Sequence, residues 1–263
     1  MTADREQGRD GMPRLSNRAV VVTGGAQGIG AAYACALAAE GAFVSVCDIQ
    51  PPDATVATIT ESGGKAVGGV CDITDAQAVA RLVQVTLARF GRVDGLVNNA
   101  ALFASLRPRP FEQIGSDEFD RVLQVNVRGT FECIKAVLPA MRQQKYGKIV
   151  NVASGTVFKG TPMMLPYVSS KGAVIALTRA VAREVGRDGI CVNCVAPGLT
   201  LSEAVRDNED YPEEMIRGTM LSRCLARDQV PEDLTGVVGF LLSSESDFMT
   251  GQTVVVDGGS VMN

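Results

Sequence analysis

Two residues four positions apart, Tyr167 and Lys171, have the side chains of an acid–base catalyst. In a helix, residues i and i+4 share a face, which would place the lysine ammonium beside the phenol. A nearby positive charge favours phenolate and lowers the pKa of tyrosine from its ordinary value of about 10. Such a pair could transfer protons near neutral pH in a chain that contains no histidine.

The Tyr167–Lys171 spacing is only suggestive by itself, because two such residues on a helix can also form an ordinary solvated pair. Chance placement gives about one such match in ten chains of this composition. Two further features add weight to it. Ser154 lies thirteen residues before the tyrosine, and a glycine-rich turn begins at Gly24.

The composition is that of an ordinary soluble globular protein, with 46% hydrophobic and 21% charged residues in a chain of 263. This length suits one large α/β domain or two small ones. The net charge of −4 argues against a nucleic-acid-binding surface, and no apolar run approaches the roughly 18 residues of a membrane helix. Residues 1–13 are polar and charged, so we expect a flexible tail there rather than a signal peptide.

The seven cysteines are an odd and scattered set, which without a secretory signal indicates a reduced, cytoplasmic protein. Cys191 and Cys194 form a C-x-x-C motif. They lie in a strand-like run, however, where residues three apart point to opposite faces. We therefore expect core positions for both and no metal site.

Apolar runs typical of buried strands alternate with helical stretches along the whole chain. Strands are expected at 19–23, 43–47, 66–71, 95–98, 148–152, 190–195 and 253–256, and helices at 29–40, 54–62, 75–90, 116–143, 167–186 and 231–243. Apolar strands separated by helices indicate a parallel sheet that is covered on both faces. The sequence thus predicts a single doubly wound Rossmann-type α/β domain over 14–263, with a mostly parallel seven-stranded sheet and a substrate lid at 199–227.

A glycine-rich turn follows the first predicted strand directly and opens the first predicted helix. Its glycines let the backbone turn tightly and let a diphosphate approach the free N–H groups and positive dipole at the helix N-terminus. A turn used only for packing is the alternative, but strand, turn and helix in register favour dinucleotide binding. The residues assigned to this part of a cofactor site are Gly24, Gln27, Gly28, Ile29 and Gly30.

Asp48 ends the second predicted strand, 18 residues after Gly30. A carboxylate there can accept hydrogen bonds from the ribose hydroxyls of adenosine, and it would repel a 2′-phosphate. No arginine or lysine stands at 26–27 or 49–50 to hold that phosphate, so NAD is favoured over NADP. A simple turn residue before Pro51 is the other interpretation of Asp48.

Polar residues also follow the third and fourth predicted strands, at the ends where ligands of such sheets bind. Asp72, with Ile73 beside it, is placed to contact adenine, and the backbone at Asn99 and Ala100 is placed to pass the adenosine ribose. Each is weak evidence alone, because Asp and Asn are common loop residues.

Together these motifs resemble the short-chain dehydrogenase/reductase family over residues 14–263. The matching motifs are Thr23-Gly24-x3-Gly28-x-Gly30, Asp72, Asn98-Asn99-Ala100, Asn126, Ser154, Tyr167-x3-Lys171, Pro197-Gly198 and Val256-Asp-Gly-Gly259. Ala101 stands where the family usually has glycine, which predicts a slightly different backbone at that position.

The resemblance implies four catalytic residues. Tyr167 would exchange the proton of the substrate hydroxyl, and Ser154 would hold the substrate oxygen. Lys171 would lower the pKa of Tyr167 and bind the nicotinamide ribose. Asn126 would anchor a water that connects Lys171 with bulk solvent.

The resemblance also implies the reaction, which is direct hydride transfer between a substrate carbon and NAD. Pro197, Gly198 and Thr200 would contact the nicotinamide, with Ser202 as the alternative to Thr200. The family usually forms homotetramers, so a homotetramer is expected here as well.

Apolar side chains dominate the segments expected to form the substrate pocket. Phe103, Phe158, Met163 and Met164 are the expected contacts around Ser154, and they favour a hydrophobic or cyclic secondary alcohol or ketone. Packing of the loops against each other explains these residues equally well.

Two other functions remain open. A 3-oxoacyl-thioester reductase of lipid synthesis has the same overall pattern, although Asp48 disfavours the NADPH that such reductions generally use. A catalytically silent binding or scaffold protein would not need Asn126, Ser154, Tyr167 and Lys171 together. We expect a small-molecule substrate, and neither a nucleic-acid nor a membrane partner.

Overall fold

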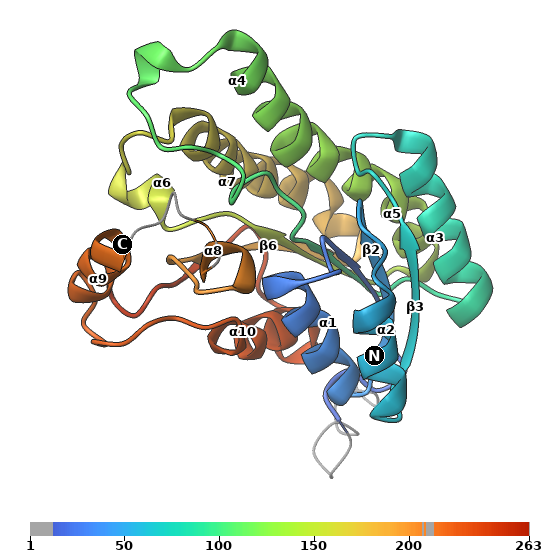
Figure 1. Cartoon of the computed structure of the whole chain (residues 1–263). Coiled ribbons are helices and arrows are strands. Elements are labelled where there is room, and N and C mark those ends of the chain that lie inside the picture. The colour runs from blue at the N-terminus through green and yellow to red at the C-terminus, as the bar shows by residue number, and fades with distance from the viewer. Residues whose placement is uncertain (1–12, 207, 209–212, 263) are drawn as a thin grey trace.

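Seven parallel strands form one sheet in the order β3-β2-β1-β4-β5-β6-β7 (Figure 1). The computed structural model describes residues 13–206, 208 and 213–262, except for the side chain of Met215. Apart from Pro13, the predicted N-terminal tail therefore lies outside the described residues. The strands are β1 Ala19–Thr23, β2 Phe43–Asp48, β3 Lys65–Val70, β4 Gly95–Asn98, β5 Gly147–Val152, β6 Ile190–Pro197 and β7 Thr253–Val256.

Helices follow almost every strand, as the alternating pattern predicts. They are α1 Gly28–Ala39, α2 Asp53–Glu61, α3 Ala76–Phe90, α4 Ser116–Leu123, α5 Thr130–Gln144, α6 Thr156–Lys159, α7 Leu165–Val185, α8 Glu203–Arg206, α9 Glu213–Leu221 and α10 Glu232–Leu242. Short 3₁₀ turns occur at η1 Phe111–Gln113, η3 Gly186–Asp188 and η4 Ser244–Ser246. Within the described residues, none of the helices combines the length and the apolar character that crossing a bilayer requires.

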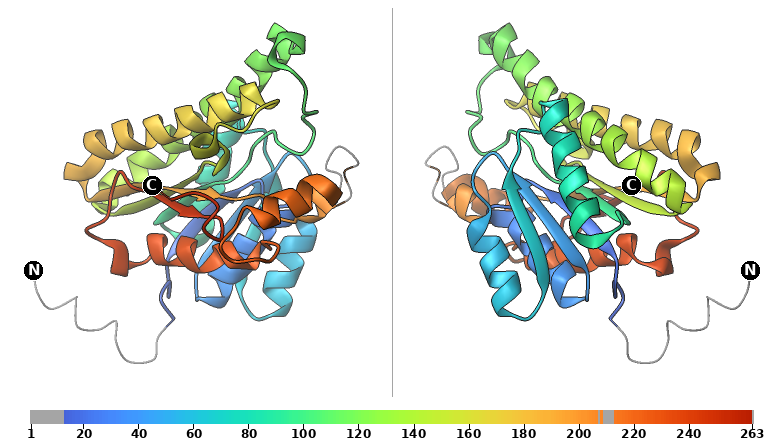
Figure 2. Two further views of the ribbon diagram at one scale, coloured as in Figure 1. Left: turned by 90° about the vertical axis from the view of Figure 1, so that its left-hand side faces the viewer. Right: turned by 90° about the vertical axis from the view of Figure 1, so that its right-hand side faces the viewer.

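The sheet separates two apolar cores, because successive side chains of a strand point to opposite faces. In β1, Val20 and Val22 pack with residues of α1, α2 and α10, whereas Val21 packs with residues of α3, α5 and α7. Figure 2 shows the two helical layers on either side of the sheet. This arrangement confirms the predicted doubly wound Rossmann-type fold with helices on both faces.

The direction in which successive strands are added to the sheet reverses between β1 and β4. From β1 the chain first builds outward through β2 and β3, and it then returns to place β4 on the other side of β1. The loops after these two strands consequently diverge and leave a crevice at the carboxyl ends of the strands, which is where open α/β sheets bind ligands.

The predicted long helix at 116–143 is interrupted in its middle. A π-helical turn, η2 Gln124–Gly129, separates α4 from α5. Asn126 lies in this turn, and its carbonyl accepts a hydrogen bond of 2.8 Å from Thr130 Oγ1. Such wide turns are rare and occur frequently at functional sites. The spacing of the apolar residues does not predict this interruption, because one extra residue in a single turn hardly changes that spacing.

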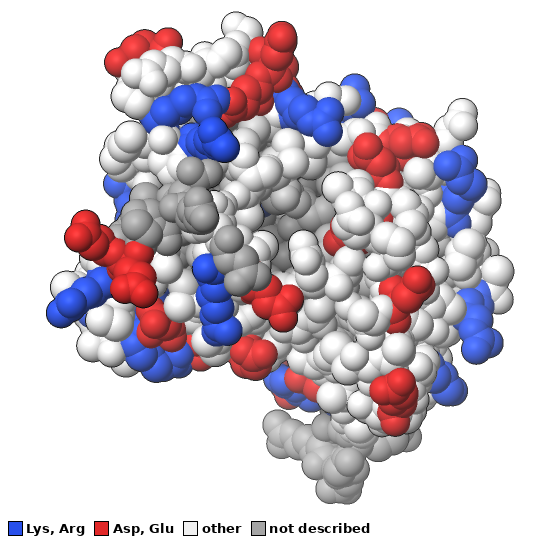
Figure 3. All heavy atoms as spheres, viewed as in Figure 1, with Lys and Arg blue, Asp and Glu red and all other residues white. Residues whose placement is uncertain are grey.

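The predicted lid at 199–227 contains two short helices, α8 and α9. Residue 207 and residues 209–212 of this segment lie outside the described part of the chain. Both ends of this segment are attached to the body of the protein. Leu201 N donates to Gln229 O (2.8 Å), and Leu225 N donates to Gly258 O (2.9 Å). Figure 3 shows a hollow in this face of the molecule, with acidic and basic side chains interspersed around it.

Candidate active site

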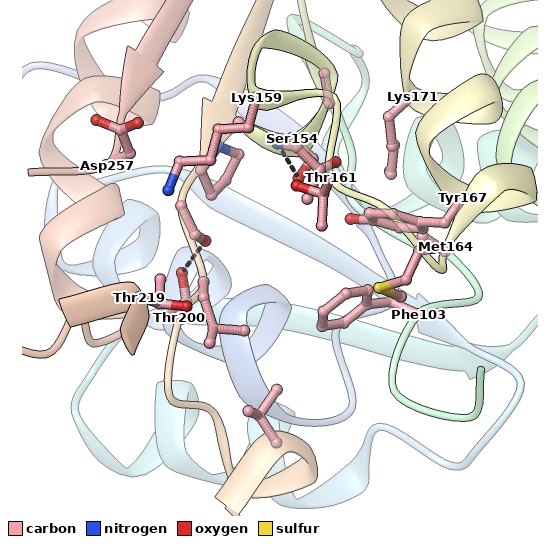
Figure 4. Close-up of a pocket in the computed structure, with 18 of the residues that line it drawn as sticks. Phe103, Ser154, Lys159, Thr161, Met164, Tyr167, Lys171, Thr200, Thr219 and Asp257 are labelled. Atoms are coloured by element: carbon pink, nitrogen blue, oxygen red, sulfur yellow. Dashed lines mark hydrogen bonds between the residues drawn. The ribbon is translucent and has the colours of Figure 1, made fainter. Parts of the chain in front are cut away.

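A cavity of about 580 Å³ lies at the carboxyl ends of the strands (Figure 4). Its walls come from the loop after β4, the segment from β5 into α7, the end of β6 and the lid. The predicted residues that it brings together are Ile29, Asn99, Phe103, Ser154, Met163, Met164, Tyr167, Lys171, Pro197, Gly198 and Thr200.

Tyr167 and Lys171 lie on the same side of α7, as their spacing predicts. The Nζ of Lys171 is 5.7 Å from the centre of the Tyr167 ring, and both side chains are buried. Nζ donates a hydrogen bond of 2.7 Å to Val152 O on β5. Burial lowers the pKa of Lys171 to about 8, although the Cys194 thiol acts in the opposite direction. The lowered pKa of Tyr167 itself stays a prediction.

Ser154 follows β5, and Tyr167 extends toward it in the cavity (Figure 4). The Oγ of Ser154 accepts a hydrogen bond from the backbone N–H of Thr156 (3.2 Å). A hydroxyl that accepts in this way keeps its own proton for donation to a ligand oxygen. Its place suits the predicted role of holding the substrate oxygen.

Asn126 is almost completely buried, and its side-chain amide connects two segments of the site. Its Oδ1 accepts from Leu102 N (2.7 Å), and its Nδ2 donates to Leu102 O (3.2 Å) and to Ser170 Oγ (3.0 Å). Ser170 Oγ in turn donates to Tyr167 O (2.7 Å). Asn126 thus fixes the loop after β4 against the helix that carries the tyrosine, a positional role that its spacing alone did not suggest.

The ring of Phe103 packs directly against the ring of Tyr167. The two ring centres are 4.8 Å apart and the planes are inclined by 44°. Because Asn126 holds the backbone of the neighbouring Leu102, the same hydrogen bonds set the position of the phenylalanine. Phe103 therefore forms an apolar wall beside the phenol.

The glycine-rich turn between β1 and α1 brings three backbone segments into close contact. A Cβ at Gly30 would lie 1.9 Å from Gly24 O, and one at Gly24 would lie 2.7 Å from Ala100 Cα. Gly24 and Gly28 have positive φ angles of 66° and 58°. The side chain of Gln27, the N-cap residue of α1, makes no capping hydrogen bond, so this end of the helix fits the diphosphate of a dinucleotide.

Of the residues predicted to contact adenosine, Asp48, Asn99 and Ala100 adjoin the turn, and only Asn99 lines the cavity. Asp48 Oδ2 accepts from Ala26 N (3.1 Å), so this carboxylate also supports the glycine-rich turn. The amide of Asn99 donates to Thr23 O (3.1 Å) and Gly24 O (3.0 Å). Asp72 is exposed and accepts from the backbone N–H and hydroxyl of Thr74 (both 2.8 Å).

The side chains of Ile73 and Ala100 pack with the core and not in the cavity. Ile73 is buried in the core on the α3–α5 side, and Ala100 packs against the same core. At the other end of the site, Thr200 is buried and its Oγ1 donates to Gly198 O (3.1 Å). Pro197, Gly198 and Thr200 all line the cavity, as does the alternative residue Ser202.

Comparisons with known proteins agree with this geometry. A family model described as "Enoyl-(Acyl carrier protein) reductase" matches residues 24–261. The chain belongs to the short-chain dehydrogenase/reductase family. Similar proteins include a 2,5-dichloro-2,5-cyclohexadiene-1,4-diol dehydrogenase of Sphingobium indicum, which is 38% identical over 94% of this chain and 98% of its own length.

Two further relatives show the breadth of this family. A 3-oxoacyl-[acyl-carrier-protein] reductase of Synechocystis sp. is 36% identical over 95% of this chain and all of its own length. The crystal structure of an NAD⁺-bound xylitol dehydrogenase has a TM-score of 0.88 and 35% identity, and it covers 94% of this chain and 100% of that chain. Like them, this short-chain dehydrogenase/reductase is an oxidoreductase that acts on CH–OH groups with a nicotinamide cofactor.

One predicted substrate contact of this dehydrogenase/reductase is misplaced. Phe158 does not line the cavity, because α6 turns its ring onto the core around Val174 and Cys194. Sequence reasoning expected the segments of Lys159 and Thr219 in the pocket wall but did not single out these two residues, which do line it. Asp257 also lines the cavity. The motif Val256-Asp-Gly-Gly259 contains this residue, but the motif alone does not predict that its carboxyl group lies in the cavity wall.

The buried ammonium of Lys171 should make the stability of the folded state depend on pH. Its pKa is about 8 when folded and 10.5 ordinarily, so the unfolded chain binds more protons between these values and stability rises with pH across that window. Lys171→Met should lack this rise, which amounts to about 3 kcal/mol. Urea denaturation of both proteins from about pH 7 to about pH 10.5 measures it, with Lys65→Met, an exposed lysine, as the control. A constant difference between wild type and Lys171→Met would contradict the buried charge.

Proposed function

We propose that this protein is an NAD-dependent dehydrogenase that interconverts a hydrophobic or cyclic secondary alcohol and its ketone. The observation that carries the proposal is the convergence of Ser154, Tyr167 and Lys171 on one cavity. Phe103 and Met164 supply apolar surface beside the phenol (Figure 4). The cyclohexadiene-diol dehydrogenase among the relatives supports a cyclic substrate.

In this mechanism Tyr167 Oη accepts the proton of the substrate hydroxyl during oxidation and returns it during reduction. Ser154 Oγ donates a hydrogen bond to the substrate oxygen and stabilises the negative charge that develops there. The ammonium of Lys171 lowers the pKa of Tyr167. A bound nicotinamide ring supplies the hydride chemistry, which no side chain of this protein can provide.

A catalytically silent member of the family is the competing hypothesis. Such a protein does not need a serine hydroxyl, a phenol and a lysine at one point, nor an asparagine that holds their segments in place. The 3-oxoacyl-thioester reductase is also disfavoured, because Asp48 stands at the end of β2 where NADPH would bring its 2′-phosphate.

Tyr167→Phe tests the proposal directly. Turnover of secondary alcohols should fall by about a thousandfold or more, because the proton acceptor is lost, while NAD binding measured by fluorescence titration should be retained. Tyr33→Phe is the matched control, since this phenol is buried away from the cavity and its hydroxyl has no hydrogen-bond partner among the described residues. Unchanged turnover in Tyr167→Phe would refute the assignment.

The preference for NAD rests on the carboxylate of Asp48. The NAD⁺-bound state of the related xylitol dehydrogenase supports the same choice. In Asp48→Asn the repulsion of a 2′-phosphate is removed while the amide oxygen can still accept from Ala26 N. We expect the ratio of kcat/KM for NAD over NADP to exceed about ten in wild type and to fall about tenfold in this variant. Asp53→Asn, at the exposed start of α2, should keep the wild-type ratio, and equal rates with NADP in wild type would overturn the preference.

We also propose a cytoplasmic location, which thiol chemistry supports. All seven cysteines are free, as expected in a reducing compartment. Cys194 is buried in β6 and Cys191 is half-buried.

Among the described residues, no group of three or more His, Cys, Asp or Glu side chains could hold a metal ion.

A homotetramer is the proposed assembly. A groove between the α4–η2 segment and α7 supports it; its lining combines apolar residues, Leu123, Val127, Phe131, Ala173 and Leu177, with Asp120, Gln124 and Arg128. Phe131 is 46% exposed in the single chain, which is costly for so large an apolar residue. Sedimentation should give four times the chain mass of 27.7 kDa, and Phe131→Glu should give smaller species. A wild-type mass near that of one chain would exclude the tetramer.

A further inference from the structure

The cavity has a second polar region, separate from the reaction centre. Lys159 extends from α6 away from Tyr167, toward the side of the cavity where Thr219 and Asp257 lie (Figure 4). Ser222, at the end of the lid helix α9, lines the same side. These residues come from three separate segments of the chain, and the proton-transfer mechanism uses none of them.

The ammonium group of Lys159 has fewer partners than it can bind. It donates one hydrogen bond of 3.1 Å, to Ser222 Oγ, whereas an ammonium has three protons to donate. Within the described part of the chain, no carboxylate oxygen lies within 4.0 Å of it. Partial burial lowers the pKa of Lys159, an effect that the Arg223 charge adds to and the Asp257 charge opposes. Lys159 is exposed, so its remaining N–H groups are free to bind water until a ligand acceptor atom takes the place of that water.

The neighbouring groups determine which kind of acceptor fits. Asp257 is 3% exposed, and its Oδ1 accepts from Gly259 N and Ser260 N (both 3.0 Å), while its Oδ2 has no hydrogen-bond partner among the residues that the structure describes. Its negative charge faces the same region as Lys159, so a carboxylate ligand would be repelled. A neutral oxygen can accept from the ammonium without that repulsion, and if it is a hydroxyl it can also donate to a neighbouring side-chain oxygen.

We propose that the substrate carries a second, neutral oxygen function, a hydroxyl or a ketone, that accepts a hydrogen bond from Lys159 while the reacting carbinol lies at Ser154 and Tyr167. The chemical class is a diol, hydroxyketone or diketone whose carbon skeleton lies along the apolar wall that includes Phe103 and Met164. Lys159 is then a specificity-determining residue. This inference rests on the proposed dehydrogenase function, because it assigns the substrate class of the same site.

The test compares cyclohexanol with 1,2-, 1,3- and 1,4-cyclohexanediol as substrates of the wild-type enzyme with NAD. A hydrogen bond to a charged group discriminates by about tenfold to a hundredfold, so kcat/KM should exceed that of cyclohexanol by this factor for at least one diol. In Lys159→Met, which has no donor, the ratio should fall to about one, whereas Lys159→Gln, whose side-chain amide can still donate, should keep part of it. The control Lys65→Met should keep the wild-type ratio. Calorimetric binding to Tyr167→Phe should rank the compounds in the same order without any turnover.

Four other outcomes would contradict the inference, and each of them identifies a different cause. If wild type oxidises cyclohexanol as well as the best diol, the second oxygen site is absent although the dehydrogenase function stands. If 4-hydroxycyclohexanecarboxylate is preferred over every diol, Lys159 recognises an anion and the neutral-oxygen assignment is wrong. An equal loss for all substrates in both Lys159 variants would show that Lys159 only attaches α6 to the lid through Ser222. No turnover of any compound would refute the proposed function, and the inference with it.

Discussion

The site depends on a positive charge that is held inside the protein. Lys171 lies under the reaction centre with 3% of its surface exposed, and its ammonium donates to Val152 O at the end of β5. Burial of a cation is unfavourable without compensating partners, and this is why its pKa falls. In the proposed mechanism the same low-polarity surroundings would strengthen its effect on the nearby phenol of Tyr167, since charges interact more strongly away from water. The buried charge therefore lowers the stability of the folded state and, in the proposed mechanism, assists proton transfer at Tyr167.

Positioning of the tyrosine involves a closed set of contacts around Asn126. The π-helical turn presents this amide to Leu102 on one side and to Ser170 on the other. From Leu102 the chain continues to Phe103, whose ring packs on Tyr167, and from Ser170 a hydrogen bond returns to the Tyr167 carbonyl. Side chains whose neighbours are fixed in this way keep one geometry, which proton transfer over a short distance requires. The rare helical turn thus has a structural consequence at the proposed catalytic residue, Tyr167.

The predicted diphosphate site beside the cavity is formed mainly by backbone, whereas side chains form much of the cavity around Tyr167. Close approach of Gly24, Gly30 and Ala100 leaves no space for a Cβ, so the turn presents N–H groups to an anion. The opposite walls come from α6, the start of α7 and the lid, where side-chain identity can change without disturbing the sheet. Such a division explains how one fold in this family can act on many alcohols and ketones while the cofactor site stays the same.

Local patterns in the sequence determined the fold and the reaction class. Alternating apolar strands and helices predict the parallel sheet, and the Tyr167-x3-Lys171 spacing places both side chains on one face of a helix because the helical period is local. Contacts between distant segments decided the rest. Only the tertiary structure turns Phe158 into the core and Phe103 onto Tyr167, inserts the π-helical turn at Asn126, and brings Lys159 and Asp257 to one side of the cavity. The physical reason is that burial and side-chain neighbours depend on how separate elements pack, which no short-range spacing specifies.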